Sequence, residues 1–168
     1  FTVDNDSVTM SLQDSKLEGG AVRLLFGVLK FNTTITDLDL SGAGIAASAA
    51  MDLALALQAN KSLKSLDLAR NALSTITEYI NPNTIVEKGK KDSQPPTGPN
   101  GEKLHDTKGL EALASAVRAS SSLEAITLEG GKLPVTQLKG IVKVKSLDLS
   151  RRNFSHISAF VLGTLLQG

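Results

Sequence analysis

The sequence contains no cysteine and very few aromatic residues, and both absences narrow what this chain of 168 residues can be. Without cysteine there is no disulfide framework and no thiolate metal site, which favours an intracellular setting. With aromatic residues at 4%, a core must consist mainly of Leu, Ile, Val and Ala. Such a composition suits thin, repeated layers of structure.

Long apolar runs and an excess of one charge sign are also missing. No apolar run reaches the roughly 18 residues that a membrane-spanning helix needs, so the sequence predicts no membrane span. The formal net charge is +1, which argues against a nucleic-acid or membrane-surface binder that relies on bulk charge. The length allows one domain with a sizeable core.

One pattern recurs along the chain. In LKSLDLARNAL, which begins at Leu63, leucine falls at positions 63, 66, 68 and 73. The frame returns in SVTMSLQDSKL from Ser7, ITDLDLSGAGI from Ile35, LEAITLEGGKL from Leu123 and VKSLDLSRRNF from Val144. A spacing of three and then two fits a short strand whose alternate side chains point into a layer. One such unit can bury its leucines only by stacking on its neighbours.

The segments between the copies predict helices, because apolar residues recur there on one helical face. The equivalent apolar positions are Leu25, Leu53, Leu113 and Leu162, followed by Leu29, Leu57, Val117 and Leu166. A small residue precedes each pair by four positions: Ala21, Ala49, Gly109 and Ser158. We expect these small residues to let the helices lie close to the strand layer.

The pattern LxxLxLxxNxL followed by an alanine-rich helix resembles leucine-rich repeat proteins. The period of 28 and the segment AMDLALALQANKSL resemble the ribonuclease-inhibitor-like subclass, which includes the repeat domains of NOD-like receptors. The segment LPVTQLKGIVKVKSLDLSRRNF also resembles repeat proteins from protists and microalgae. The resemblance implies an α/β fold, a right-handed solenoid or horseshoe of about five strand-turn-helix repeats, with a parallel concave sheet and convex helices. The resemblance also implies that residues 1–168 form a single domain.

The family places an asparagine where the chain leaves each strand, and its side chain hydrogen-bonds backbone groups there. Only Asn71 keeps this residue; Ser15, Ala43, Gly131 and Arg152 replace it in the other copies. We therefore expect looser turns in those units.

Two stretches break the period. Residues 78–106 form a proline-rich insertion between repeats, and long loops of this kind are usually functional or disordered. It is either a tolerated surface insertion or a docking arm, in which Lys88, Lys90 and Lys91 would contact a partner. The step from Leu123 to Val144 is shorter than a period, so PVTQLKGI from Pro134 has room for about one helical turn.

The concave sheet is the predicted binding face. Its middle row of outward positions holds three aspartates, which could select a partner with the opposite charge arrangement or could simply be solvated strand residues. The predicted contact residues are Asp37, Asp39, Asp67, Asp148 and Glu129 on this face, with Arg70, Arg151 and Arg152 in the adjoining turns.

Catalytic and metal-binding patterns are weak. His105 and His156 have no Cys or carboxylate at ligand spacing, and neither a phosphate loop nor a nucleophile elbow is visible. The sequence therefore predicts no enzyme and no cofactor, but a non-catalytic interaction or scaffold module for a protein partner, without nucleic acid.

The ends of the repeat array favour a subunit of a larger assembly or a fragment of a longer array, because a solenoid needs polar capping units. We expect the last helix to expose Val161 and Leu165, where other subunits could pack end-on. Such a subunit would be cytoplasmic, ciliary or organellar. Two alternatives stay open: a ligand-sensing repeat domain of a NOD-like receptor type protein, and a GTPase-activating regulator in which Arg70 or Arg151 reaches the nucleotide.

Overall fold

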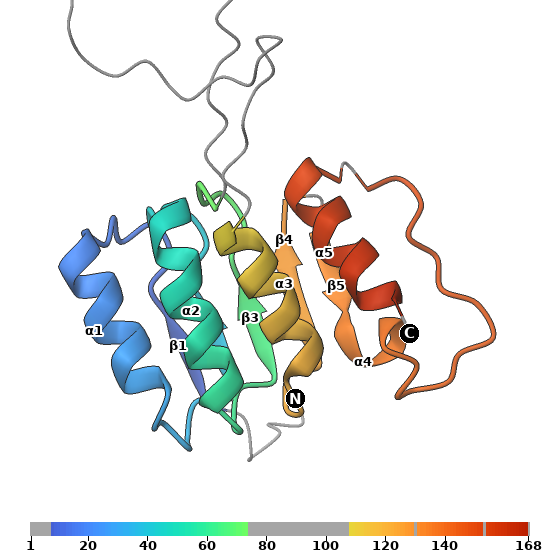
Figure 1. The fold of residues 1–168 in the computed structure, drawn as a ribbon, viewed down its shortest axis with the longest axis horizontal. Helices are drawn as coiled ribbons and strands as arrows, with labels where there is room; N and C mark the ends of the chain where they lie inside the picture. The colour runs from blue at the N-terminus through green and yellow to red at the C-terminus, as the bar shows by residue number, and fades with distance from the viewer. Residues whose placement is uncertain (1–7, 74–107, 130, 153, 168) are drawn as a thin grey trace, which may run out of the picture.

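The computed structural model describes residues 8–73, 108–129, 131–152 and 154–167. Within these ranges a sheet carries helices on one side, and we call its other side the open face (Figure 1). The predicted insertion at 78–106, with Lys88, Lys90 and Lys91, lies outside the described residues. Among the described helices, none has the length and apolar character needed to cross a membrane.

The strands pair in the register that the repeat frame predicts. They are β1 (Thr9–Ser11), β2 (Asp37–Asp39), β3 (Ser65–Asp67) and β4 (Ala125–Leu128), and each is parallel to the next. The central apolar residue of each strand therefore lies beside the next one, as Leu38 does beside Leu66 and Leu66 beside Ile126. These side chains point into the core, and their neighbours in the strand point to the open face.

The helices lie side by side over the sheet. They are α1 (Gly19–Leu29), α2 (Ala47–Ala59), α3 (Lys108–Ala119) and α5 (His156–Leu166) (Figure 1). In α2 and α3 the predicted inward positions are buried, with Leu53, Leu57, Leu113 and Val117 at most 1% exposed. The strand-turn-helix alternation predicted for these units is confirmed.

At Gly109, the small residue that we expected to let the helix approach the strand layer has a different role. A Cβ atom there would lie 2.8 Å from the carbonyl oxygen of Ala47 and 3.1 Å from the Cβ of Ala50, both in α2. The close approach that glycine allows is therefore between neighbouring helices, not between a helix and the strand layer.

The prediction of a fifth parallel strand is wrong. Residues 146–148 lie in an irregular segment, and the fifth strand is instead β5 (Gly131–Pro134), which pairs antiparallel with β4. This hairpin occupies the sheet edge that the frame assigned to the fifth copy. Asp148 therefore lies outside the row of strand residues. The single helical turn expected after Pro134 is present as α4 (Val135–Leu138).

The last helix is rotated relative to its predicted frame. Val161 is fully buried and Leu165 is 3% exposed, whereas Leu166 is 61% exposed. The expectation that Val161 and Leu165 form an exposed end is therefore wrong. In the segment VLGTLL, the pair Val161 and Leu165 and the pair Leu162 and Leu166 are both apolar. Periodicity alone therefore could not choose between these two helical frames, which differ by one residue.

Candidate functional site

The aspartates of the predicted binding face first serve the backbone of their own turns. One carboxylate oxygen of Asp39 accepts a hydrogen bond from the N–H of Ser41 at 2.9 Å, and Asp67 does the same for Ala69 at 2.9 Å. Asp148 accepts from the N–H of Ser150 at 2.8 Å. This Asx turn recurs after each LDL sequence, so these residues have a structural role besides any binding role.

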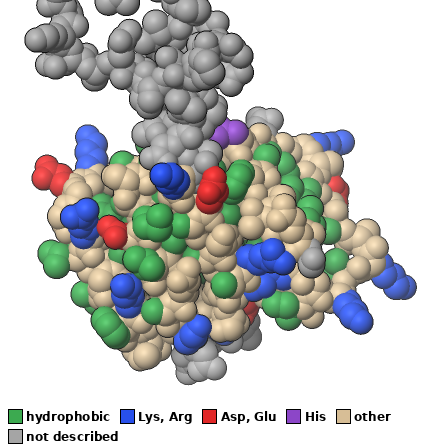
Figure 2. Space-filling view, in the orientation of Figure 1, with side chains coloured by type: hydrophobic (Ala, Val, Ile, Leu, Met, Phe, Trp, Pro, Cys, Tyr) green, Lys and Arg blue, Asp and Glu red, His purple; other side chains and the backbone are tan. Residues whose placement is uncertain are grey.

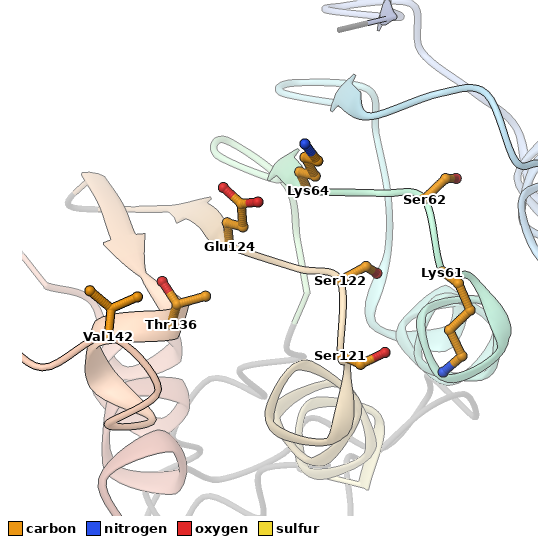
Figure 3. Close-up of a pocket in the computed structure, with 8 residues that line it drawn as sticks. All are labelled: Lys61, Ser62, Lys64, Ser121, Ser122, Glu124, Thr136 and Val142. Atoms are coloured by element: carbon orange, nitrogen blue, oxygen red, sulfur yellow. The ribbon is translucent and has the colours of Figure 1, made fainter. Parts of the chain in front are cut away.

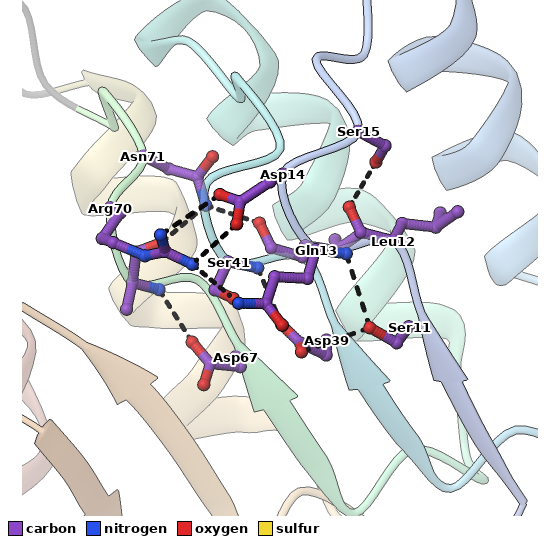
Figure 4. A network of polar contacts seen from close by, with 12 residues as sticks. Ser11, Leu12, Gln13, Asp14, Ser15, Asp39, Ser41, Asp67, Arg70 and Asn71 are labelled. Carbon is purple, nitrogen blue, oxygen red and sulfur yellow. Dashed lines mark hydrogen bonds and ion pairs between the residues drawn. The ribbon is translucent and has the colours of Figure 1, made fainter.

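The carboxylate of Asp39 lies in a network of polar contacts on the open face (Figure 4). The hydroxyl of Ser11, on the neighbouring strand, donates to its second oxygen at 3.3 Å. Burial raises the pKa of Asp39, but hydrogen bonds from Ser41 and Ser11 and the charge of Arg70 outweigh it and hold the pKa below its ordinary 3.8. Asp39 is therefore ionised at neutral pH.

Asp148 is ionised at neutral pH for a related reason, although it lies away from the sheet. Hydrogen bonds from the side chain and backbone of Ser150 lower the pKa of Asp148, and the charge of Arg152 acts in the same direction.

The structure brings together only part of the predicted acidic set. Asp37 and Asp39 lie on β2, and Asp67 lies beside Asp39 on β3. Glu129 instead lies at the end of β4, where the hydroxyl of Ser155 donates to its carboxylate at 3.4 Å. The acidic row that the described residues form is therefore Asp37, Asp39 and Asp67.

Two arginines of the predicted basic edge, Arg70 and Arg152, are already engaged within the chain. The guanidinium of Arg70 pairs with the carboxylate of Asp14, with Nη1 and Oδ1 3.2 Å apart. Both side chains are more than half exposed, so this pair stabilises the fold by about 1 kcal/mol at most. Arg152 donates to the backbone carbonyl of Lys132. Arg151 is exposed at its turn.

The turns share a backbone feature that the sequence reading missed. The same frame position has a positive φ in four units, with φ 55° at Asp14, 62° at Gly42, 59° at Arg70 and 57° at Arg151. Glycine at one of these positions was the available signal, because the left-handed region favours glycine. A Cβ at Gly42 would also collide with the carboxylate of Asp14, so glycine there leaves room for the pair between Asp14 and Arg70.

Asn71 makes the contacts that the family resemblance implies. Its amide donates to the carbonyl oxygens of Leu40 at 2.8 Å and Leu68 at 3.0 Å, and its oxygen accepts from the N–H of Ile45 at 2.9 Å.

Asn60 has a matching role at the other end of the strands. Its amide donates to the carbonyl oxygen of Leu29 at 2.7 Å.

Helix α1 carries an exposed apolar side that the sequence reading overlooked. Leu24 is 74% exposed, Val28 66% and Phe31, just beyond the helix, 84%. We call these three residues the apolar side of α1. Figure 2 shows hydrophobic side chains among Lys and Arg residues over this region of the helix-covered face. The signal was present in GGAVRLLFGVL, where Arg23 is the one charged residue.

The repeat frame shows why the apolar side of α1 is unusual. Its positions correspond to Asp52, Ala56 and Ala59 on α2, and to Ala112, Ala116 and Ala119 on α3. Ala56 and Ala116 are completely buried. On the same side of the helix, the carboxylate of Asp52 lies 3.4 Å from the guanidinium nitrogen of Arg23 on α1. Hence α1 carries the large, exposed Val28 where α2 and α3 carry the small, buried Ala56 and Ala116.

A hollow of about 540 Å³ lies where the chain enters β3 and β4 (Figure 3). Its lining includes Lys61, Lys64, Ser122 and Glu124, so cationic, neutral and anionic groups are mixed. In the part of the chain that the structure describes, no group of three His, Cys, Asp or Glu side chains could hold a metal ion.

Comparison with known proteins supports the repeat over part of the chain. A family model described as "Leucine Rich repeat" matches residues 31–54 and 59–75. No curated protein gives a significant match. The solved structure "Leiomodin-1 Actin-Binding Site 2 (ABS2)" is similar at 19% identity and a TM-score of 0.48, covering 71% of this chain and 51% of that chain. The chain thus spans about half the length of that structure. The matched repeats, which extend over β2, α2 and β3, support a leucine-rich repeat protein.

Proposed function

We propose that the chain is a non-catalytic protein-interaction module that binds its partner on the apolar side of α1. The exposure of Leu24, Val28 and Phe31 is the observation that supports this proposal. Contiguous exposed apolar surface on a soluble protein is typical of a protein contact. The residues follow one another at four and then three positions, so they form one continuous ridge along the helix.

The size of these side chains indicates the kind of partner. Where helices of this fold pack closely, the equivalent positions on α2 and α3 hold alanine at Ala56 and Ala116. Larger residues at those positions require a wider separation, because the distance between packed helices depends on the side chains at the contact. We therefore expect the partner to present an apolar helix or an apolar groove.

The test compares one variant of the apolar side with a matched control. The variant is Leu24→Lys with Val28→Lys. The control is Met51→Lys with Leu55→Lys on α2, whose side chains are 44% and 45% exposed. Each protein is used for affinity capture from native lysate with quantitative mass spectrometry, and circular dichroism checks folding. We expect specific partners of the wild type to be retained by the control and lost by the variant. Equal capture by all three proteins would contradict the proposed surface.

The acidic row is a second candidate surface for the same function. Asp39 and Asp67 hold charge on neighbouring strands, and charge complementarity commonly sets partner choice. Substitution by asparagine suits this test, because its side-chain oxygen still accepts the turn hydrogen bond while the charge is removed. If Asp39→Asn with Asp67→Asn loses a partner and stays folded by circular dichroism, the charge of the row is the recognition element.

We also infer that the repeats form a right-handed solenoid of the ribonuclease-inhibitor-like subclass, which serves as a scaffold or as a subunit of an assembly. The spacing of 28 residues between the first three copies and the in-register parallel strands support this inference. The absence of cysteine supports an intracellular setting. Small-angle X-ray scattering would measure the curvature, and a straight, uncurved particle would contradict the horseshoe.

A further inference from the structure

We infer that two segments of this chain compete for the edge of β4. One is β5, which pairs there in the structure. The other is residues 146–148, which match the same edge as a parallel strand in the repeat frame. This inference is independent of the surface that binds a partner.

The sequence of the competing segment is that of a strand. VKSLDLSRRNF, from Val144, is identical to LKSLDLARNAL, from Leu63, at its Lys, both Leu, Ser, Asp and first Arg positions. In the copy from Leu63 the shared SLD is strand β3. By contrast, β5 has the sequence GKLP. Glycine and proline are poor strand residues, and Pro134 has no N–H to donate. Local preference and observed pairing therefore disagree at this edge.

The competing segment already has the turn that follows a strand in the other units. Asp148 accepts from the N–H of Ser150 as Asp39 does from Ser41 and as Asp67 does from Ala69. Arg151 has φ 57°, close to the 59° of Arg70. The segment therefore needs only a neighbouring strand edge to complete the repeat conformation.

Burial shows that the segment is incompletely packed in the present arrangement. Val144 is 45% exposed, whereas Leu63 at the same frame position is 1% exposed. Leu147 and Leu149 are only partly buried against the core. Pairing with β4 would remove more of this apolar surface from water.

One contact holds the segment to the outer side of β5. The guanidinium of Arg152 donates to the backbone carbonyl of Lys132, which lies in β5. This contact would be lost if residues 146–148 replaced β5 at the edge of β4. Removing it should therefore favour the exchange.

The chain between the two competing strands is long enough for the exchange. Leu133 occupies the frame position of Leu73, and both side chains are fully buried, so Leu133 can stay in the core. Residues 135–143 can reach about 30 Å when extended, more than the about 13 Å length of a four-residue strand. Exchange would place Asp148 beside Thr127 and add its charge to the open face.

Pairs of engineered cysteines distinguish the two arrangements, because the natural chain has no cysteine. Thr127→Cys with Lys132→Cys reports the hairpin, in which these two residues face each other. Thr127→Cys with Asp148→Cys reports the exchanged register. Asp67→Cys with Asp148→Cys is the control, because strands two apart lie about 10 Å from each other, beyond the reach of a disulfide. Disulfide formation in a glutathione buffer is followed by mass spectrometry.

We expect the hairpin pair to close and the 127–148 pair to close at least tenfold faster than the 67–148 control. Adding Arg152→Ala should increase the rate of the 127–148 pair further. The inference is overturned if the 127–148 pair closes no faster than the control.

Discussion

At the scale of single residues, Asn71 joins neighbouring repeats through one side chain. It is 7% exposed, and its amide serves carbonyl groups of two units while its oxygen serves the N–H of Ile45. Backbone groups that lose a buried partner cannot be compensated by water. This residue therefore stabilises the fold through polar contacts and not through apolar burial.

We predict that Asn71→Ala lowers the free energy of unfolding by about 2–4 kcal/mol, because it leaves several buried backbone groups unpaired. Urea unfolding followed by circular dichroism measures this change. Asn32→Ala is the comparison, since the oxygen of Asn32 accepts from the nearby N–H groups of Ile35 and Thr34 at a partly exposed turn. Its cost should be about 1 kcal/mol. Equal costs for the two variants would contradict the role assigned to Asn71.

The lowered pKa of Asp39 predicts an acid-dependent part of the stability. A carboxyl whose pKa is lower in the folded state stabilises the fold above its ordinary 3.8 and loses this contribution as the pH falls through the lower folded value. Stability should therefore decline below about pH 4. Asp39→Asn removes the titrating group while keeping an acceptor for Ser41, so its unfolding free energy should fall less steeply with acid. An unchanged slope in urea unfolding at several pH values would refute this assignment.

At the scale of elements, the contact between α2 and α3 depends on glycine. Because a Cβ at Gly109 would meet the backbone of Ala47, Gly109→Ala must shift one helix. We predict a loss of about 1–2 kcal/mol after the better helix propensity of alanine is included. Gly163, in α5, has no atom within 4 Å of a Cβ position. Gly163→Ala should therefore stabilise the protein by about 0.5–1 kcal/mol. Thermal melting compares the two, and a stabilising Gly109→Ala would show that the helices are not in close contact.

Elements with regular spacing could be predicted from the sequence, whereas their exceptions could not. Leucine positions three and then two apart predicted β2 and β3 and their register, because alternate side chains must enter one layer. The antiparallel pairing of β5 with β4 brings a segment outside the repeat pattern to the sheet edge, and sequence periodicity carries no information about such a segment. The rotation of α5 escaped prediction because Leu165 and Leu166 are both apolar.

The candidate site was predictable to a similar extent. The frame placed Asp37, Asp39 and Asp67 on one face correctly. It could not show that each LDL aspartate accepts a hydrogen bond from its own turn, because that depends on backbone direction after the strand. The apolar side of α1 was missed because the repeat frame considered only the inward positions of that helix, and a comparison of burial with α2 and α3 distinguishes it.

At the scale of the whole molecule, each unit contacts mainly its neighbours. Helix α1 contacts α2, α2 contacts α3, and α3 contacts α5. Stability in such stacked structures is approximately a sum of unit and nearest-neighbour terms. The effect of a destabilising substitution at one end should therefore decrease with distance along the stack.

We predict that Phe26→Ala, which truncates a side chain 1% exposed in α1, accelerates amide hydrogen exchange in β1 and α1 more than in α3 and β4. Leu113→Ala in α3 is the control, because α3 contacts helices on both sides and its effect should spread in both directions. Hydrogen exchange with mass spectrometry resolves the segments. Uniform acceleration by Phe26→Ala would indicate a single cooperative unit instead.

The pair between Arg70 and Asp14 can form only when one repeat lies between its two ends. It joins the first and third units across Gly42 of the second, a separation of 56 residues, or two periods (Figure 4). Neighbouring strands are about 4.8 Å apart, so duplication of the second unit would add that distance and place the carboxylate beyond the reach of the guanidinium. Deletion of the unit would bring the two turns into direct contact. Gain or loss of a repeat between these two residues would therefore break the pair, at a cost of about 1 kcal/mol at most.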